Sequence, residues 1–252
     1  MSTTHKALFV SDIHFPRHSP RHVNLLMKVV KAWKPDSIDL LGDIDDADST
    51  GRWAEGTPDA IVGIGEGGVK ETTQLFADLR EERKDALIRM HDGNHGWTRH
   101  RQYLEKKAPA LMDMIDADKL YEYSKHGVEW HDYDKPPVKL FDTGTLYGHH
   151  GESISKHAGE SVRNDCLNWG VSLIRGHSHR QGVYKKSYPM TGQEIRGFEI
   201  GHLTDISQMT YTVNHDWQAG FAVGYIDDTG DHIQLIEIMD NTCYVDGKRF
   251  VA

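Results

Sequence analysis

Cysteine is scarce in this 252-residue chain, in which only Cys166 and Cys243 occur. Two cysteines cannot build the disulfide framework that stabilises many small secreted domains. The start of the sequence also lacks the extended apolar stretch and small-residue cleavage site of a signal peptide. No apolar run approaches the roughly 20 residues that a membrane-spanning helix requires. We therefore expect a cytoplasmic protein without a membrane segment.

Positive charge is also in short supply, since 29 Lys and Arg residues face 38 Asp and Glu residues, for a net charge of −9. This balance argues against a surface that coats nucleic acid in general. It does not exclude a nucleotide or nucleic-acid substrate, because bound divalent cations can dominate the local field. With 38% hydrophobic residues and no repeat or linker, the chain is expected to form one domain over residues 1–252.

The first part of the chain alternates apolar, strand-like segments with amphipathic helical ones. Residues 6–10 and 37–41 flank a helical pattern over 22–33, which predicts a βαβ unit with parallel strands. Residues 51–68 are rich in glycine but lack the spacing of a nucleotide P-loop, so we expect a mobile loop near the strand ends. Further expected elements are helices over 69–83 and 157–169, helical segments over 99–123, strands over 86–90 and 171–174, a hairpin over 138–147, and β segments over 182–252.

Asp, Asn or His residues follow each of five strand-like segments. Binding groups in α/β sheets gather beyond the carboxyl ends of the strands, so these residues can converge. Their carboxylate, carboxamide and imidazole groups suit divalent metals, and the absence of cysteine favours a catalytic over a structural site. Each cluster alone is a common polar strand end, but turn chemistry does not explain all five. The clusters are Asp12-Ile13-His14, Gly42-Asp43-Ile44-Asp45-Asp46, Gly93-Asn94-His95, His149-His150-Gly151 and Gly176-His177-Ser178-His179.

As a set, these motifs resemble the signature of the calcineurin-like metallophosphoesterases: Asp-x-His, Gly-Asp-x-x-Asp, Gly-Asn-His, His-Gly and Gly-His-x-His. The matching motifs lie within residues 12–179, and residues 182–252 carry none of them. The resemblance implies an α/β fold in which a two-sheet mixed β-sandwich is flanked by helices, with a dinuclear metal site at the carboxyl ends of the strands. It also implies that the C-terminal β region completes the second sheet.

The resemblance further implies a role for each matching residue. A hydroxide bridging two divalent ions would attack phosphorus in line, with His95 as general acid and Asp46 orienting its ring. Manganese is the first choice of metal, and iron, zinc, nickel and cobalt remain possible. His149 stays open as an alternative ligand to His150, because neighbouring side chains of a strand point to opposite sides. The implied ligands are Asp12, His14 and His179 for one metal, Asn94, His150 and His177 for the other, and Asp43 for both.

Two positions depart from the pattern of protein-phosphatase-type members, which carry Arg and an acidic residue where this chain has Ala47 and Gly96. The missing Arg removes an expected phosphate clamp, which favours a phosphodiester of a nucleotide-like or nucleic-acid substrate. A broad phosphomonoesterase or protein phosphatase, a non-catalytic metal-binding module and a metal-dependent amide or ester hydrolase remain alternatives. The sequence indicates no oligomeric state. Arginines that can replace the clamp are Arg17, Arg52, Arg99 and Arg180, although each alone is more typical of a solvated surface.

Overall fold

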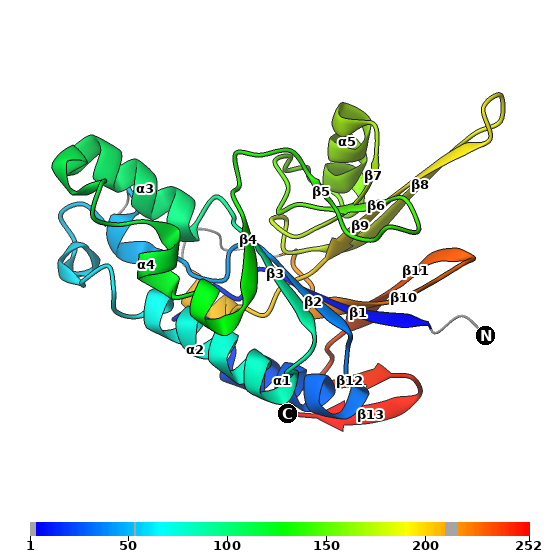
Figure 1. The fold of residues 1–252 in the computed structure, drawn as a ribbon, viewed down its shortest axis with the longest axis horizontal. Coiled ribbons are helices and arrows are strands. Elements are labelled where there is room, and N and C mark those ends of the chain that lie inside the picture. Colours follow the sequence, from blue (N-terminus) through cyan, green and yellow to red (C-terminus); the bar gives the residue numbers. More distant parts are fainter. Residues whose placement is uncertain (1–3, 53, 210–215) are drawn as a thin grey trace.

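Two main β-sheets form the centre of the molecule, and helices cover the outer face of each sheet (Figure 1). The computed structural model describes residues 4–52, 54–209 and 216–252. Residues 210–215, which fall inside the predicted C-terminal β region, lie outside the described part. Within the described residues, no helix combines the length and apolar character needed to cross a membrane. The predicted α/β fold with two mixed sheets flanked by helices is confirmed.

The first sheet has six strands in the order β11-β10-β1-β2-β3-β4. Strands β1 to β4 run parallel, which confirms the βαβ unit, whereas β10 and β11 run antiparallel to their neighbours. Strand β4 was not predicted, because only Val128 among its four residues is fully buried and no clear apolar pattern results. The strands are β1 His5–Val10, β2 Ser37–Leu41, β3 Leu87–His91, β4 Val128–His131, β10 Gly220–Asp227 and β11 Gly230–Glu237.

The second sheet has five strands in the order β5-β6-β7-β9-β8. The assignment of the whole C-terminal region to this sheet was wrong: β8 and β9 lie in it, but β10 and β11 extend the first sheet. The last two strands form a separate hairpin. The remaining strands are β5 Val138–Lys139, β6 Leu146–Gly148, β7 Ser172–Arg175, β8 Gln181–Tyr188, β9 Gln193–Ile200, β12 Thr242–Val245 and β13 Lys248–Val251.

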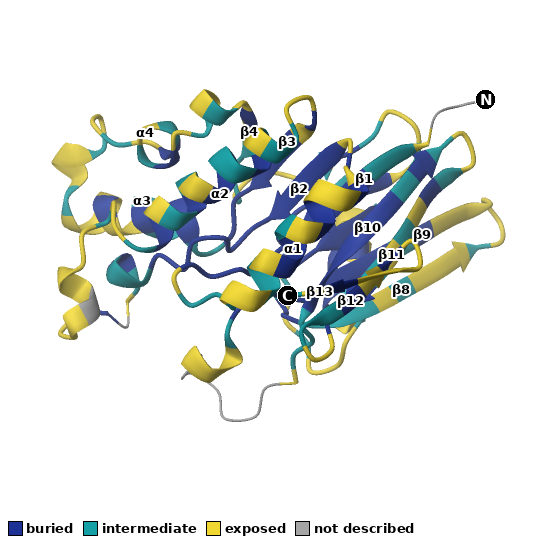
Figure 2. Ribbon diagram, turned by 90° about the horizontal axis from the view of Figure 1, so that it is seen from below, coloured by how far each residue is buried: buried dark blue, intermediate teal, exposed yellow. Residues whose placement is uncertain are grey.

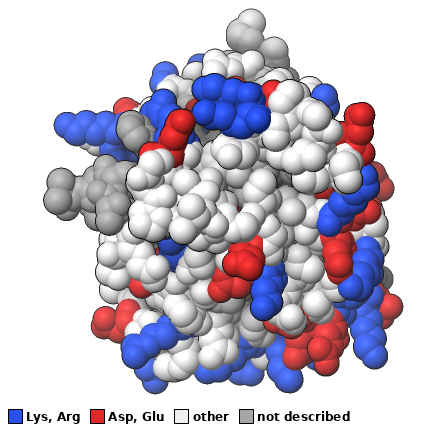
Figure 3. Space-filling model, turned by 90° about the vertical axis from the view of Figure 1, so that its left-hand side faces the viewer, with Lys and Arg blue, Asp and Glu red and all other residues white. Residues whose placement is uncertain are grey.

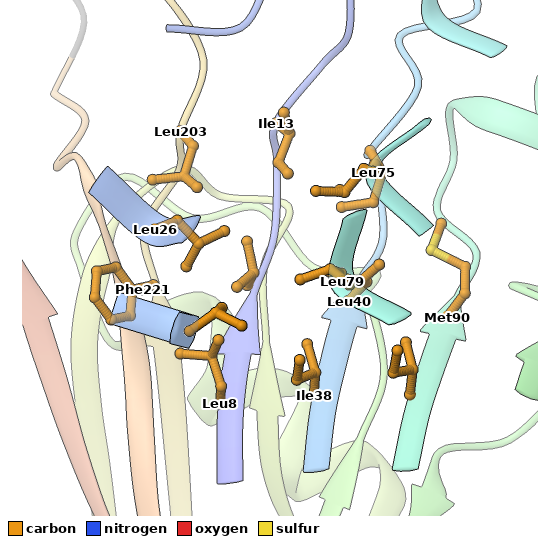
Figure 4. Packing of buried hydrophobic residues seen from close by; sticks show 14 of the residues in the cluster. Leu8, Ile13, Leu26, Ile38, Leu40, Leu75, Leu79, Met90, Leu203 and Phe221 are labelled. Atoms are coloured by element: carbon orange, nitrogen blue, oxygen red, sulfur yellow. The ribbon is translucent and has the colours of Figure 1, made fainter. Parts of the chain in front are cut away.

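Strand β1 is buried on both faces, as expected for a central strand between helices and a second sheet. Leu8 and Val10 belong to the core beneath the helices, whereas Ala7 and Phe9 belong to the core between the sheets. Figure 4 shows Leu26 of α1 close to Leu8 in the first of these cores. This double burial holds the loop after β1 at a fixed position.

Helices α1 (Pro20–Trp33) and α2 (Gly68–Glu82) turn their buried faces toward the first sheet (Figure 2). Helix α5 (Glu160–Trp169) packs on the second sheet (Figure 1). Helix α1 begins where the Ser19 side chain accepts a hydrogen bond from the His22 amide, and Pro20 occupies the first turn. The helical segments predicted over 99–123 are present, and the chain divides between them at Pro109, which has no amide hydrogen to donate. The segment forms α3 Gly96–Lys107, a 3₁₀ turn at Pro109–Leu111 and α4 Ala117–Tyr121.

Candidate metal centre

The residues of the five motifs lie in the loops that directly follow β1, β2, β3, β6 and β7. Strands β1 to β3 are parallel within the first sheet, and β6 and β7 are parallel within the second. Their carboxyl ends therefore open on one edge of each sheet. Three groups of side chains with ligand atoms within 4.8 Å of one another form there. These groups are Asp12 with His14 and His179, His14 with Asp46 and His95, and Asp43 with His150 and His177.

The backbone at this edge is left-handed at five of the seven predicted ligands. Residues other than glycine avoid this region at a cost of roughly 1–2 kcal/mol each. Such conformations persist only where the surroundings fix them, and they cluster at functional sites. The φ angles are 52° at Asp12, 57° at His14, 50° at Asp43, 69° at His177 and 57° at His179.

Asp12, His14 and His179 form the first ligand group. The Nε2 atoms of His14 and His179 are 3.1 Å apart, and Asp12 Oδ1 lies 3.1 Å from His179 Nε2. Despite that distance, Asp12 Oδ1 is buried and accepts no hydrogen bond from any group within the described residues. Two imidazole nitrogens and one carboxylate oxygen thus point toward the same position. Atoms that share a bound cation are arranged in this way.

His150, His177 and Asn94 form the second group. His150 Nε2 lies 3.2 Å from Asn94 Oδ1, while its Nδ1 donates to the Leu41 carbonyl at 2.8 Å. That backbone bond leaves the Nε2 lone pair facing the centre. The His177 ring lies 4.9 Å from the His150 ring, and burial lowers the pKa of His177 to about 3, so its imidazole is neutral. A neutral imidazole is the form that binds a metal.

Asp43 stands between the two groups. Its Oδ2 atom is 3.2 Å from His150 Nε2 on one side and 3.9 Å from His14 Nε2 on the other. Its Oδ1 atom accepts a hydrogen bond from the His95 amide at 2.9 Å. The carboxylate is thus oriented by the backbone and touches both groups at once.

The charge of the pocket also suits cations. Asp12, Asp43 and Asp46 are buried carboxylates in one small volume. Burial would raise the pKa of Asp43, but the imidazoles of His150 and His95 hold that pKa below its ordinary value. Burial would lower the pKa of His14, but the carboxylates of Asp12 and Asp46 raise it to about 10. A proton on His14 thus supplies part of the positive charge that divalent ions would provide.

Two motif glycines leave room for ligand carboxylates. A Cβ atom at Gly93 would lie 2.0 Å from Asp43 Oδ1, and one at Gly176 would lie 2.4 Å from Asp12 Oδ2. Any larger residue would push these carboxylates out of place. The glycines of the third and fifth motifs are therefore part of the site, although they offer no ligand.

Asp46 contacts both a predicted metal ligand, His14, and the predicted general acid, His95. Its Oδ1 atom accepts hydrogen bonds of 2.7 Å from Nδ1 of both His14 and His95, which turns the Nε2 atom of each ring toward the centre. Burial would raise the pKa of Asp46, but these two hydrogen bonds hold it well below the usual range. The contact with His95 was expected, and the contact with His14 was not, because no sequence pattern encodes it.

Arg99, one of the four candidate arginines, contacts His95. Its Nη2 atom lies 2.6 Å from His95 Nε2, and its Nη1 atom donates to the Asp46 carbonyl at 2.8 Å. Arg17 pairs with Asp48 at 2.6 Å and lies 3.5 Å from Asp46 Oδ2. Arg180 donates to the Ser155 carbonyl at 3.0 Å. A helical spacing of four residues between His95 and Arg99 is the signal that could have indicated this contact.

Comparison with known proteins places the fold beside a solved structure but assigns no family. No family model matches the sequence. The "Gene 54 protein" of Mycobacterium phage L5 is 24% identical over 96% of this chain and 97% of its own length. The protein of the same name from Mycobacterium phage D29 is 26% identical with the same coverage. Vacuolar Protein Sorting 29 from Cryptosporidium parvum shares the fold, with a TM-score of 0.51 at 14% identity over 99% of this chain and 96% of that chain.

The two adjacent histidines after β6 face different surroundings. His150 is fully buried and faces Asp43. His149 stacks on Tyr133 with ring centroids 5.5 Å apart, and its Nε2 donates to the Tyr133 carbonyl at 3.1 Å. Its Nδ1 accepts from the Gly151 amide, and burial lowers its pKa to about 4. His149 therefore supports the loop, and His150 is the residue that the geometry offers as a ligand.

This difference predicts opposite results for the two alanine variants. His150→Ala is expected to weaken binding of the second metal by at least about tenfold, because one of its imidazole donors is lost. His149→Ala lowers thermal stability but keeps the wild-type metal content. Metal-to-protein ratios after equilibration with limiting Mn²⁺ measure both effects. Loss of metal in His149→Ala with full metal in His150→Ala would reverse the assignment.

Proposed function

We propose that this chain is a two-metal phosphodiesterase of the calcineurin-like metallophosphoesterase type. The observation that carries the proposal is the position of Asp43 Oδ2, 3.2 Å from His150 Nε2 and 3.9 Å from His14 Nε2. A single carboxylate oxygen between two groups of imidazole-nitrogen and oxygen donors is suited to bridging two cations. The fit of the pocket is further supported by the unpaired, buried Oδ1 atom of Asp12.

The residues have separate tasks in this proposal. Asp12, His14 and His179 would hold one ion, and Asn94, His150 and His177 the other. When bound, the ions supply an activated water nucleophile and neutralise charge on the phosphate oxygens. In hydrolysis of the phosphodiester, a P–O bond forms to the oxygen of water, and the P–O bond to the leaving oxygen breaks. The leaving oxygen gains a proton.

His95 is the side chain placed to deliver that proton. Its Nδ1 donates to Asp46, so its Nε2 atom is the one directed toward the site. In the free protein Arg99 lies against Nε2 at 2.6 Å. A guanidinium only donates, so Nε2 carries no proton in this arrangement. Substrate would displace the guanidinium, and Nε2 would take up a proton from solvent before delivering it to the leaving oxygen. Arg99 would then be free to contact the leaving-group side of the phosphate.

The diester preference rests on the position that follows Asp46. Ala47 stands there, almost fully buried and in a left-handed conformation, and offers no charge. The terminal phosphate of a monoester carries more negative charge than a diester. The absence of a bidentate arginine therefore weakens binding of the monoester more than binding of the diester. Arg99 does not replace that clamp in the free protein, because it is held by His95 and by the Asp46 carbonyl.

Assays with a bis-aryl phosphate and an aryl phosphate, each with added Mn²⁺, test this proposal. We expect kcat/KM to favour the diester by about tenfold or more, the equivalent of one charge-assisted hydrogen bond. Metal content is measured on the same preparation. A preference for the monoester would identify a phosphomonoesterase. Protein that binds two ions but hydrolyses neither ester would be a metal-binding module.

A further inference from the structure

A second cavity opens directly beside the metal centre. Its volume is about 560 Å³, and Asn94 and Arg99 line it at the end that meets the site. One wall is the surface of α3, and the other is formed by the turn at 49–52 and the loop at 55–60. Neither the metal ligands nor the proton donor require this space.

Helix α3 gives the cavity its direction. His95 precedes the first turn of the helix, and Arg99, Tyr103 and Lys106 follow at spacings that keep them on one side. At 1.5 Å per residue, Lys106 lies about 16 Å along the axis from His95. Since His95 faces the leaving oxygen in the proposed reaction, the cavity extends from the leaving-group side.

The charged side chains that line the cavity are mainly positive. Arg52, Arg99, Lys106 and Lys107 line it, and Glu55 is its acidic residue, paired with Lys107 at 3.2 Å. This excess contrasts with the net charge of −9 for the whole chain. Figure 3 views the molecule from the side where α3 lies, and Lys and Arg side chains gather near the upper edge of that face. A local positive wall on an acidic protein selects an anionic ligand.

Tyr103 adds an aromatic surface to this wall. Its side chain lines the cavity and is 38% exposed. An exposed aromatic ring between cationic side chains is the arrangement with which proteins bind single-stranded nucleic acid, where bases stack on rings and cations track the phosphates. A cavity of this volume admits a ligand of drug-like size, which corresponds to about one unpaired nucleotide.

We propose that this cavity binds the leaving-group segment of a single-stranded nucleic acid. Tyr103 stacks on the first base beyond the bond that is cut, and Lys106 contacts the next backbone phosphate. Arg99 lies closest to the scissile phosphate. This inference rests on the proposed phosphodiesterase function and names its substrate class. A paired base cannot reach the ring, so duplex is a poor ligand.

The test uses the Mn²⁺-loaded protein with a short single-stranded oligonucleotide and with a bis-aryl phosphate. For Tyr103→Ala and Lys106→Ala, we expect the ratio of oligonucleotide to bis-aryl kcat/KM to fall about tenfold, mainly through KM. Tyr103→Phe keeps the ring and restores the ratio. Lys248→Ala, in the β12–β13 hairpin, is the matched control and leaves the ratio at the wild-type value.

A binding measurement separates this inference from the proposed function. Fluorescence anisotropy of the same oligonucleotide measures binding without turnover. In Lys106→Ala, the slope of the logarithm of the binding constant against the logarithm of the salt concentration should become shallower by about 0.7, the value for one single-strand phosphate contact. If wild type cleaves neither substrate but Lys106→Ala still weakens binding, the cavity assignment holds and the proposed function fails. If both variants lower the two activities equally, or bind the strand as wild type does, the cavity assignment is overturned. Preference for duplex also overturns it.

Discussion

Replacing Asp43 with asparagine is expected to lower phosphodiester hydrolysis by at least about 10³-fold, because the proposed two-metal site would lose the carboxylate between its two ligand groups. The amide has nearly the same shape but one neutral oxygen in place of two charged ones. Asp43 Oδ2 also lies within 3.9 Å of His14 Nε2 and 3.2 Å of His150 Nε2. The variant should therefore bind less metal as well as turn over more slowly. Steady-state assays at saturating Mn²⁺ and metal analysis after dialysis measure the two effects.

A surface substitution of the same kind controls for the change from carboxylate to amide. Asp228→Asn lies in the exposed turn between β10 and β11 and should keep wild-type activity and metal content. Thermal unfolding of Asp43→Asn checks that the fold is retained. A folded Asp43→Asn variant with near wild-type kcat would contradict the role assigned to this residue.

The second large effect is expected for Asp46→Asn, which should reduce both catalysis and metal binding. We expect kcat to fall by about 10²–10⁴-fold, the usual contribution of a general acid, because the neutral amide no longer supplies the charged acceptor that orients and stabilises the protonated His95 ring. We also expect metal affinity to fall by about 10–100-fold, the typical cost of altering a partner that orients a ligand, because His14 loses the same charged acceptor. Titration with Mn²⁺ and assays at saturating metal separate the two losses.

His95→Gln is the comparison that identifies Asp46 as a positioning residue for two rings. This variant should share the loss of kcat but keep wild-type affinity for metal, since His14 retains its contact with Asp46. A purely structural role for Asp46 would instead lower stability without changing metal affinity. If Asp46→Asn behaves like His95→Gln in both measurements, the shared hydrogen bonds do not support metal binding.

The sequence predicts the site better than it predicts the sheets around it. Ligand-type residues after each strand indicate convergence, because parallel strands of a sheet end at one edge. The placement of β10 beside β1 is not predictable in this way. The two strands are separated by about two hundred residues, and no local sequence pattern indicates that they pair. The exact point at which the helical pattern breaks near Pro109 is also not predictable, because it depends on where the chain turns next.

Side-chain direction is the other quantity that the sequence leaves open. The His-Gly motif favours His150 and leaves His149 open as the ligand, and the contact with Tyr133, sixteen residues away, shows that His149 supports the loop. Arg99 is likewise one of several arginines until its guanidinium is seen against His95. Both cases depend on a contact between segments that carry no shared pattern.

The left-handed backbone at five ligand positions limits how this centre can be redesigned. Aspartate and asparagine tolerate that conformation better than most residues, whereas branched side chains such as threonine or valine do not. Exchanging ligands to select another metal would therefore alter loop geometry along with donor chemistry at Asp12, His14, Asp43, His177 and His179. Asn94 and His150 do not carry this restriction, which makes them the sites where metal preference can be changed with the least disturbance.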